Sequence, residues 1–289
     1  MKKIFVCLDV GGTQIKAASV DAEGGIFDDG IRYFPAEAGR SAEELLGHFE
    51  AIIREVRVSE TEVAGIRLAF PGPFDYENGI CLLRGLDKYD RLHGVNLRRE
   101  LAERLGISPM HICFENDVAA YALGEMEFGE ALGAAKAFFV CIGTGCGSAF
   151  GVKGKLAPPG TSGVPENGCI YDMTFMDGCI DDYISRRGLM ELTRKQLGVE
   201  LDGRELARRV QNGDEAARQC FLIFGTRVWD ALTPFLERFH PEVLCMGGQI
   251  TRSGHLFLAP LEGYCHAAGI RLAVTEDTSL RTLQGLTRI

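Results

Sequence analysis

Two glycine-rich turns, each between two short apolar runs, are the features of this sequence best suited to phosphate chemistry. The first is Gly11-Gly12-Thr13 and the second is Gly143-Thr144-Gly145-Cys146-Gly147. Glycine lets backbone N–H groups approach a ligand closely, and consecutive N–H groups form an anion-binding nest. Each turn alone could also close an ordinary hairpin, but the pair could hold a polyphosphate. The expected phosphate-binding residues here are Gly11, Gly12, Thr13, Gly143, Thr144, Gly145 and Gly147.

Asp9 ends the apolar run directly before the first turn. A carboxylate beside a phosphate nest requires a cation to offset the repulsion between the two negative groups. We therefore expect Asp9 to hold Mg²⁺ through water. The alternative is a solvated turn aspartate with no ligand.

Asn116 and Asp117 stand where a short strand passes into a helix. Either side chain could simply cap the helix, since Asn and Asp are preferred caps. A carboxylate here could also accept the hydroxyl proton that phosphoryl transfer releases. Farther along, Gly247-Gly248 separates a strand from a helix, and it could let an adenine base lie against the backbone or be only a tight turn.

The elements that must position these residues repeat within the chain. Apolar runs at 4–8 and 15–20 flank the first turn, and runs at 137–142 and 148–152 flank the second. Two strand–turn–strand units predict two related lobes. Further strands are expected at 63–70, 112–114 and 242–246, and helices after the capping box Ser41–Glu44 and at 96–105, 117–128 and 214–238. The irregular, Gly- and Pro-rich segment 157–182 is the expected substrate loop.

Composition narrows the class of protein. The 289 residues are 46% hydrophobic and 25% charged, the balance of an ordinary globular protein. No run approaches the roughly 18 apolar residues that would span a bilayer. A net charge of −9 argues against a nucleic-acid partner. Ten cysteines, mostly inside apolar segments, favour reduced thiols, and we expect a cytoplasmic protein without membrane attachment.

Several segments together resemble the ROK family (repressors, open reading frames, kinases). Leu8–Thr13 and Gly143–Gly147 look like its two phosphate motifs, and Met246-Gly247-Gly248 looks like its adenosine motif. Pro71-Gly72-Pro73 with Asp75 resembles its Gly-x-Pro-Gly-x-x-Asp segment, with Ala69 in place of the first glycine. Glu115-Asn116-Asp117 resembles its catalytic motif. The resemblance covers residues 4 to about 250.

The resemblance implies an ATP-dependent carbohydrate kinase with an actin/hexokinase-like α/β fold, two-lobed and built from duplicated ribonuclease H-like units. The lobes would be 1–118, with the tail 275–289, and 119–274. Asp117 would be the general base, and ATP with Mg²⁺ would be the cofactors. The nucleotide site would include Gly247 and Gly248, and the expected substrate-binding residues are Gly72, Asn116, Glu166, Cys169 and Asp181.

The departures from the family pattern predict a shifted substrate. Cys169 stands where zinc-containing relatives have a histidine that also holds a sugar hydroxyl, and Asp181 replaces a glutamate. Only two sulfur ligands remain, whereas a tetrahedral structural zinc site requires four ligands. No zinc site is therefore expected. Leu83–Tyr89 also lacks the family's Ala-Asn-Leu sugar contact. A β-glucoside, an amino sugar or another non-glucose sugar is the expected acceptor.

The two ends of the chain lead to two further predictions. The kinase-like region starts at residue 4, so we expect no helix-turn-helix domain, which favours a kinase over a transcription factor. The usual terminal helix beginning Gly-Ala-Ala is missing, which suggests that a partner subunit supports the first lobe, in a homodimer. The main alternative is a non-catalytic sugar or nucleotide sensor. An acyl-phosphate or glycerol-type kinase fits the phosphate turns but not the pattern of Pro71–Asp75 and Glu166.

Overall fold

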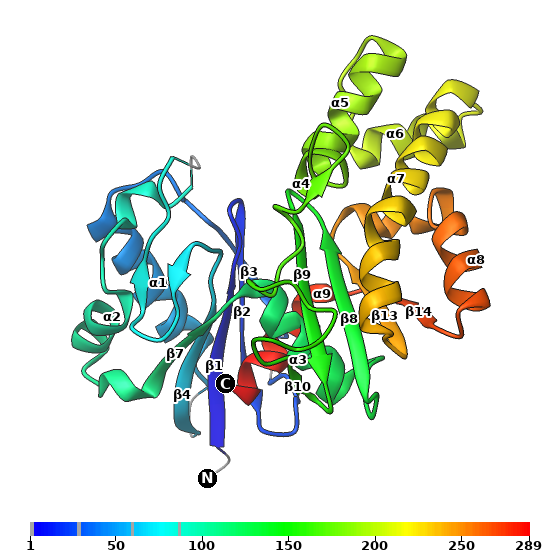
Figure 1. The fold of residues 1–289 in the computed structure, drawn as a ribbon. Coiled ribbons are helices and arrows are strands. Elements are labelled where there is room, and N and C mark those ends of the chain that lie inside the picture. The colour runs from blue at the N-terminus through cyan, green and yellow to red at the C-terminus, as the bar shows by residue number, and fades with distance from the viewer. Residues whose placement is uncertain (1–2, 28–29, 59–60, 86–87) are drawn as a thin grey trace. The chain divides into compact units, whose positions relative to one another are not determined.

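The computed structural model describes residues 3–27, 30–58, 61–85 and 88–289. They form two compact units, Met1–Gly124 with Ser279–Ile289, and Glu125–Thr278 (Figure 1). The functional lobes expected at 1–118 with 275–289 and at 119–274 stay a prediction.

A mixed five-stranded sheet forms the centre of the first unit, in the order β3-β2-β1-β4-β7. β1 and β2 form an antiparallel hairpin, whereas β4 and β7 run parallel to β1. The parallel strands therefore end at one edge of the sheet, where the first glycine turn also lies. The bounds are β1 (Lys3–Val10), β2 (Gln14–Asp21), β3 (Arg32–Pro35), β4 (Glu62–Ala69) and β7 (Ile112–Glu115).

Helices cover both faces of this sheet. On one face, α1 (Ala42–Val56) and α2 (Leu97–Leu105) pack on Val6, Leu8 and Val10 of β1. On the other face, Cys7 joins a smaller core with α3 (Asp117–Phe128), α9 (Thr278–Gly285) and the 3₁₀ turn η4 (Leu286–Arg288). The side chains of β1 thus alternate between two apolar layers, as a strand buried on both sides requires. Burial also raises the pKa of the Cys7 thiol, so this cysteine is a packing residue.

The second unit repeats the plan of the first. Its sheet has the order β10-β9-β8-β13-β14, with an antiparallel hairpin β8–β9 and parallel strands β13 and β14. Both sheets therefore place a glycine turn at the tip of their central hairpin, which matches the internal repeat seen in the sequence. The bounds are β8 (Lys136–Ile142), β9 (Cys146–Val152), β10 (Lys155–Leu156), β13 (Val243–Gly247) and β14 (Arg271–Val274).

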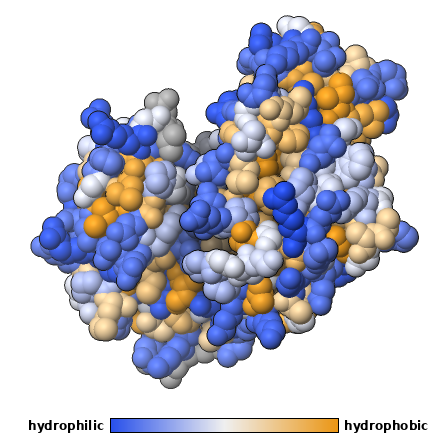
Figure 2. All heavy atoms as spheres, in the orientation of Figure 1, coloured by the Kyte–Doolittle hydropathy of each residue, from blue (hydrophilic) through white to orange (hydrophobic). Residues whose placement is uncertain are grey.

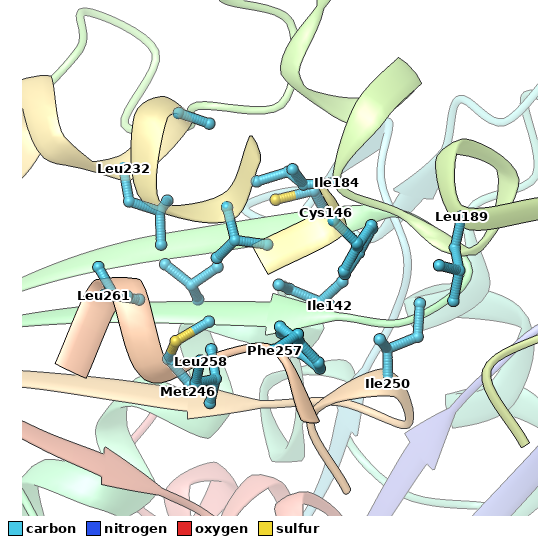
Figure 3. Close-up of a cluster of buried hydrophobic side chains, with 14 of the residues drawn as sticks. Ile142, Cys146, Ile184, Leu189, Leu232, Met246, Ile250, Phe257, Leu258 and Leu261 are labelled. Carbon is cyan, nitrogen blue, oxygen red and sulfur yellow. The ribbon is translucent and has the colours of Figure 1, made fainter. Parts of the chain in front are cut away.

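The core of the second unit lies between this sheet and a layer of helices. Ile142, Cys146 and Met246 point from the strands toward Leu232 of α7 and Leu261 of α8 (Figure 3). A buried apolar layer of this kind holds the second glycine turn on a rigid base. The helices are α4 (Ile180–Tyr183), α5 (Arg186–Leu197), α6 (Gly203–Gln211), α7 (Glu215–Phe239) and α8 (Ala259–Ala267).

Local signals in the sequence set several helix ends. The Ser41 side chain accepts from the Glu44 N–H and the Glu44 carboxylate accepts from the Ser41 N–H, so the predicted capping box begins α1. Asn96 caps α2, and Gly106 ends it in the left-handed conformation with φ 65°. Asp214 caps α7 in the same manner as Asn96 caps α2.

Short elements that the sequence pattern did not reveal complete the fold. The expected substrate loop 157–182 contains the small hairpin β11–β12 and the start of α4. Further 3₁₀ turns connect the larger elements. The bounds are β5 (Phe74–Asp75), β6 (Ile80–Cys81), β11 (Thr174–Phe175), β12 (Gly178–Cys179), η1 (Asp90–Leu92), η2 (Pro109–His111) and η3 (Ile250–Leu256).

The chain end corrects the expectation that the first lobe lacks its terminal helix. Residues 278–288 form α9 and η4, and Leu283 and Leu286 are fully buried in the first unit. The Arg67 guanidinium donates to the carbonyl of Ile289, 3.2 Å away. A helix without the Gly-Ala-Ala signature therefore covers this face, and no partner subunit is needed for that purpose.

The surface is predominantly hydrophilic on the face drawn in Figure 2, with apolar residues in separate groups. Exposed large apolar side chains include Met110, Leu132 and Met176, which belong to three different segments. In the part of the chain that the structure describes, no helix has both the length and the apolar character to cross a lipid bilayer.

A close backbone contact between α3 and α9 generates a stability prediction. A Cβ added at Gly124 would overlap with the carbonyl oxygen of Arg281. We expect Gly124→Ala to lower the free energy of unfolding by about 1–3 kcal/mol, because the helices must move apart. Gly47→Ala in α1 is the matched control, because a Cβ there meets open space. That variant should gain up to about 1 kcal/mol from helix propensity. Chemical denaturation of both variants tests this, and equal effects would contradict it.

Candidate active site

The first glycine turn closes the β1–β2 hairpin. The Gly11 N–H donates to the Gln14 carbonyl over 3.1 Å, and a Cβ at Gly11 would lie 2.8 Å from the same oxygen. Only glycine lets the two strands approach this closely at position 11. The exposed residues Gly12 and Thr13 form the tip of the turn.

The β1–β2 register places a lysine against the carboxylate that precedes the turn. Asp9 pairs with Lys16 across the hairpin, and the Lys16 Nζ lies 3.2 Å from Asp9 Oδ2. The Asp9 side chain is only 13% exposed, so a nearby cation is needed to keep its charge there. Sequence reasoning missed Lys16, although a turn centred between Gly12 and Thr13 predicts that positions 9 and 16 face each other.

The parallel strands bring the predicted catalytic motif to the same edge of the sheet. Ala69 of β4 pairs with Asp9 on one side and with Glu115 on the other. Asn116 and Asp117 follow Glu115 directly and begin α3. The Asn116 side-chain oxygen accepts from the N–H groups of Val118 at 3.0 Å and Ala119 at 3.1 Å. Asn116 is therefore the residue that caps α3, and its amide group lies toward the Tyr76 hydroxyl at 3.4 Å.

The carboxylate of Asp117 has an unusual electrostatic environment. Burial raises the pKa of Asp117, and the negative charge of Asp9 raises it further. The Val118 N–H and the Lys88 ammonium act in the opposite direction, but the net shift of the pKa is upward. A carboxylate with a raised pKa is a better proton acceptor, which is the property a general base requires. Burial also raises the pKa of the neighbouring Glu115.

The second glycine turn is held by a carboxylate from outside the hairpin. Asp181 Oδ1 accepts from the Cys146 N–H at 2.6 Å, and Asp181 Oδ2 lies 3.0 Å from Arg187. A Cβ at Gly145 would lie 2.9 Å from the same Oδ1. The Gly143 carbonyl accepts from the Arg186 N–H at 2.8 Å, and a Cβ at Gly143 would meet open space. Asp181 thus fixes the shape of this turn, whereas the sequence predicted only contact with the substrate.

The predicted adenosine motif lies at the end of β13. Gly248 has φ 96°, and a Cβ there would overlap with the Ile142 carbonyl of the neighbouring strand β8. The Thr251 hydroxyl donates to the Gly248 carbonyl at 2.7 Å. Position 248 therefore requires glycine for reasons of packing, and the flat backbone that results is compatible with a stacked base.

The remaining predicted substrate residues lie on loops. Gly72 is exposed beside Tyr76, in the first unit, and Glu166 is exposed in the second. Cys169 is partly buried, and its N–H donates to Asn167 Oδ1 at 3.0 Å. Over the residues that the structure describes, no group of three or more His, Cys, Asp or Glu side chains could hold a metal ion. Of the segment Leu83–Tyr89, residues 86–87 lie outside the described residues.

Tyr89 is a further contact to the first turn that the sequence did not reveal. Its hydroxyl donates to the Gly11 carbonyl at 2.9 Å, and its ring is fully buried between Phe49 and Phe70. Tyr89 lies 78 residues from Gly11 along the chain, so no local pattern connects them. A cavity of about 370 Å³ lies elsewhere in this unit, beside Val63 and Ile66, away from the glycine turn.

Comparisons with known proteins identify relatives of this chain. Residues 5–268 match the ROK family. A glucokinase from Thermotoga maritima is 30% identical over 279 residues, which cover 89% of this chain and 85% of that protein. The crystal structure of a ROK hexokinase from Thermus thermophilus aligns with a TM-score of 0.80 at 22% identity, over 98% of this chain and 96% of that one.

A ROK family glucokinase from Streptomyces griseus, solved in complex with glucose and AMPPNP, is a further structural neighbour. It aligns with a TM-score of 0.75 at 19% identity, over 99% of this chain and 98% of that one. These likenesses confirm the actin/hexokinase-like fold that the sequence predicted.

The raised pKa of Asp117 predicts a gain of stability on neutralisation. The folded state binds this proton more tightly than the unfolded chain, so wild-type stability falls as pH rises from the ordinary carboxyl pKa to the raised one. We expect Asp117→Asn to raise Tm by a few degrees at pH 7, with a smaller gain at lower pH. Asp75→Asn is the control of opposite sign, because hydrogen bonds from Asn78 lower the pKa of Asp75. A Tm for Asp117→Asn at or below wild type at pH 7 would refute the prediction.

Asp181 contacts both the Cys146 N–H and the Arg187 guanidinium. We therefore predict that removing Asp181 lowers the free energy of unfolding more than removing Arg187 does. Asp181→Ala leaves the Cys146 N–H without its partner and should lower the free energy of unfolding by about 1–3 kcal/mol. Arg187→Ala removes only a cation that is 65% exposed and should cost less than about 1 kcal/mol. Urea denaturation of both variants measures the difference. Equal losses would mean that the ion pair, not the backbone hydrogen bond, is the stabilising contact.

Proposed function

The chain belongs to the ROK family, and from this premise we propose that it is an ATP-dependent carbohydrate kinase that transfers the γ-phosphate of ATP to a sugar hydroxyl. Its relatives include sugar kinases, among them a glucokinase and an N-acetyl-D-glucosamine kinase. Repressors also occur among the relatives, so the proposal depends on the chemistry of this chain's own residues.

The observation that carries the proposal is the environment of Asp117. Its carboxylate has a raised pKa and follows the same sheet edge that carries Asp9 and the first glycine turn. A protein that only binds sugar or nucleotide gains nothing from an extra half-buried carboxylate whose raised pKa disfavours folding at neutral pH. A kinase does gain from it, since the group can accept a proton from the attacking hydroxyl.

In the proposed reaction, the sugar hydroxyl oxygen forms a bond to the γ-phosphorus while the bond from that phosphorus to the β,γ-bridging oxygen breaks. The hydroxyl proton passes to the Asp117 carboxylate, and ADP leaves with the bonding electron pair. Asn116 would orient the sugar through its amide group, because its side-chain oxygen already accepts from the backbone of α3. Positioning and electrostatic stabilisation account for most of catalysis in reactions of this class.

The two glycine turns would bind the phosphates of ATP. The tip of the first turn is exposed at Gly12 and Thr13, and the tip of the second is exposed at Thr144, whereas the Gly143 N–H donates to the Gly145 carbonyl at 2.9 Å. Asp9 fits a water-mediated Mg²⁺ site, because it is a partly accessible carboxylate that Lys16 contacts through only one oxygen. When bound, Mg²⁺ would neutralise phosphate charge.

The acceptor is proposed to be a sugar other than plain glucose, such as a β-glucoside or an amino sugar. Cys169 offers a weaker hydrogen-bonding group than the histidine of many relatives. The replacement at position 181 has less weight, because the Asp181 carboxylate makes the backbone contact that holds the second turn. An aspartate or a glutamate carboxylate could make this contact. The replacement at position 181 therefore does not support the alternative of a sensor that has lost catalytic activity. A homodimer stays a prediction from the resemblance.

The role of Asp117 predicts that Asp117→Asn abolishes transfer and spares binding. We expect kcat to fall by roughly 10²–10⁴ because the proton acceptor is lost. The Kd for ATP should change by less than about threefold. ADP formation in the presence of Mg²⁺ and a panel of hexoses, amino sugars and β-glucosides measures the first quantity, and calorimetry measures the second.

Asp230→Asn is a suitable control, because Asp230 is an exposed carboxylate on α7 and is not among the predicted site residues. Turnover that survives in Asp117→Asn would remove this residue from the mechanism. If the wild type binds Mg-ATP but phosphorylates no sugar in the panel, the sensor alternative is favoured. If plain glucose is the tightest ligand, the proposed shift of substrate is wrong.

A further inference from the structure

Lys88 lies beside the first glycine turn and is fixed there by the residue that follows it. The Tyr89 hydroxyl donates to the Gly11 carbonyl at 2.9 Å, and the Tyr89 N–H donates to the Ala38 carbonyl at 2.9 Å. The ring is fully buried, and the backbone has φ 57°, in the left-handed region. Two hydrogen bonds and a buried ring thus hold this backbone in one conformation, so the attachment point of the Lys88 side chain is fixed.

The Lys88 side chain extends across the tip of the turn. A Cβ added at Gly12 would lie 3.3 Å from Lys88 Cδ. Its ammonium is close enough to Asp117 to lower the pKa of that carboxyl group. Lys88 therefore connects the two features that a phosphoryl-transfer site must combine, namely the phosphate-binding backbone and the proton acceptor.

The two lysines near the turn differ in how their charges are used. Lys16 Nζ lies 3.2 Å from Asp9 in a partly buried ion pair, so its charge already offsets that carboxylate. Within the described residues, the Lys88 ammonium makes neither an ion pair nor a hydrogen bond with the protein. A lysine held beside a phosphate nest without a protein partner is suited to receive an anion, because its ammonium acts as a mobile point charge.

We propose that Lys88 is a catalytic residue that contacts the transferred phosphoryl group of ATP. The inference rests on the proposed kinase function and adds to it the cation of the first turn. Lys88 donates hydrogen bonds to the γ-phosphate oxygens and keeps its proton throughout. It thereby stabilises the negative charge on the transferred group while the sugar oxygen–phosphorus bond forms and the bond to ADP breaks. Groups that offset charge in this way typically contribute about 10²–10³ in kcat.

A different role for Lys88 would be to act only through Asp117. In that case its sole effect would be to hold Asp117 ionised, and it would not touch the nucleotide. The two roles separate in the Asp117→Asn background, where there is no carboxylate charge to act on. Contact with the γ-phosphate predicts that Lys88→Met still weakens ATP binding in that background, whereas action through Asp117 predicts no effect.

The test compares Lys88→Met with Lys88→Arg and with Arg99→Met. Arg99 is a cation on α2 that is 74% exposed and is not among the predicted site residues, so its removal controls for the change in net charge. We expect Lys88→Met to lower kcat by about 10²–10³. Lys88→Arg should retain much of the activity, and Arg99→Met should match the wild type. Calorimetry should show that Lys88→Met weakens ATP binding about tenfold or more but leaves ADP binding nearly unchanged.

Three outcomes would overturn the inference: Lys88→Met turning over within twofold of wild type, equal losses for ATP and ADP, or no loss of ATP binding in the Asp117→Asn background. Failure of the kinase proposal looks different, since the wild type would then phosphorylate no sugar. In that case the ATP and ADP affinities of Lys88→Met still decide whether Lys88 contacts the terminal phosphate. A melting curve like that of the wild type shows that the Lys88→Met protein is folded.

Discussion

Two carboxylates at one edge of a mixed sheet create the constraint on which the first unit depends. Asp9 and Asp117 repel each other, and the protein accepts that repulsion at a partly buried edge where water cannot screen it fully. Lys16 offsets one charge by direct pairing, and Lys88 offsets part of the other at longer range. The apolar layers on both faces of the sheet hold these four side chains together, because each charge alone would be costly to bury.

The two glycine turns occupy equivalent positions in the two units, but different hydrogen bonds stabilise them. Both lie at the tip of a central hairpin in sheets of the same strand order. The first turn is held by the Tyr89 hydroxyl on the Gly11 carbonyl, and the second by the Asp181 carboxylate on the Cys146 N–H. A donor supports one turn and an acceptor supports the other. The duplicated plan thus fixes where the turns lie, and each unit stabilises its own turn independently.

Sequence reasoning predicted what depends on neighbouring residues and missed what depends on distant ones. The capping box at Ser41 and the ends of α2 follow from three or four adjacent positions, and the structure confirms them. The contact of Asp181 with Cys146 joins residues 35 apart, and that of Tyr89 with Gly11 joins residues 78 apart, so no periodicity reveals either. The assignment of Asp117 as the base came from resemblance, because a strand-to-helix junction explains Asn116 and Asp117 equally well as caps.

The close fit of α9 against α3 determines the order in which the two units can complete their folding during synthesis. The core that contains Cys7, Ala18 and Ala120 is completed only by Leu283 and Leu286. The ribosome therefore synthesises the whole second unit, Glu125–Thr278, before the residues that close the first unit exist. Domains usually fold as units during synthesis, N-terminal first. Here the unit that begins first must finish last, and one face of its sheet is covered only in part, by α3, until residues 279–289 leave the ribosome.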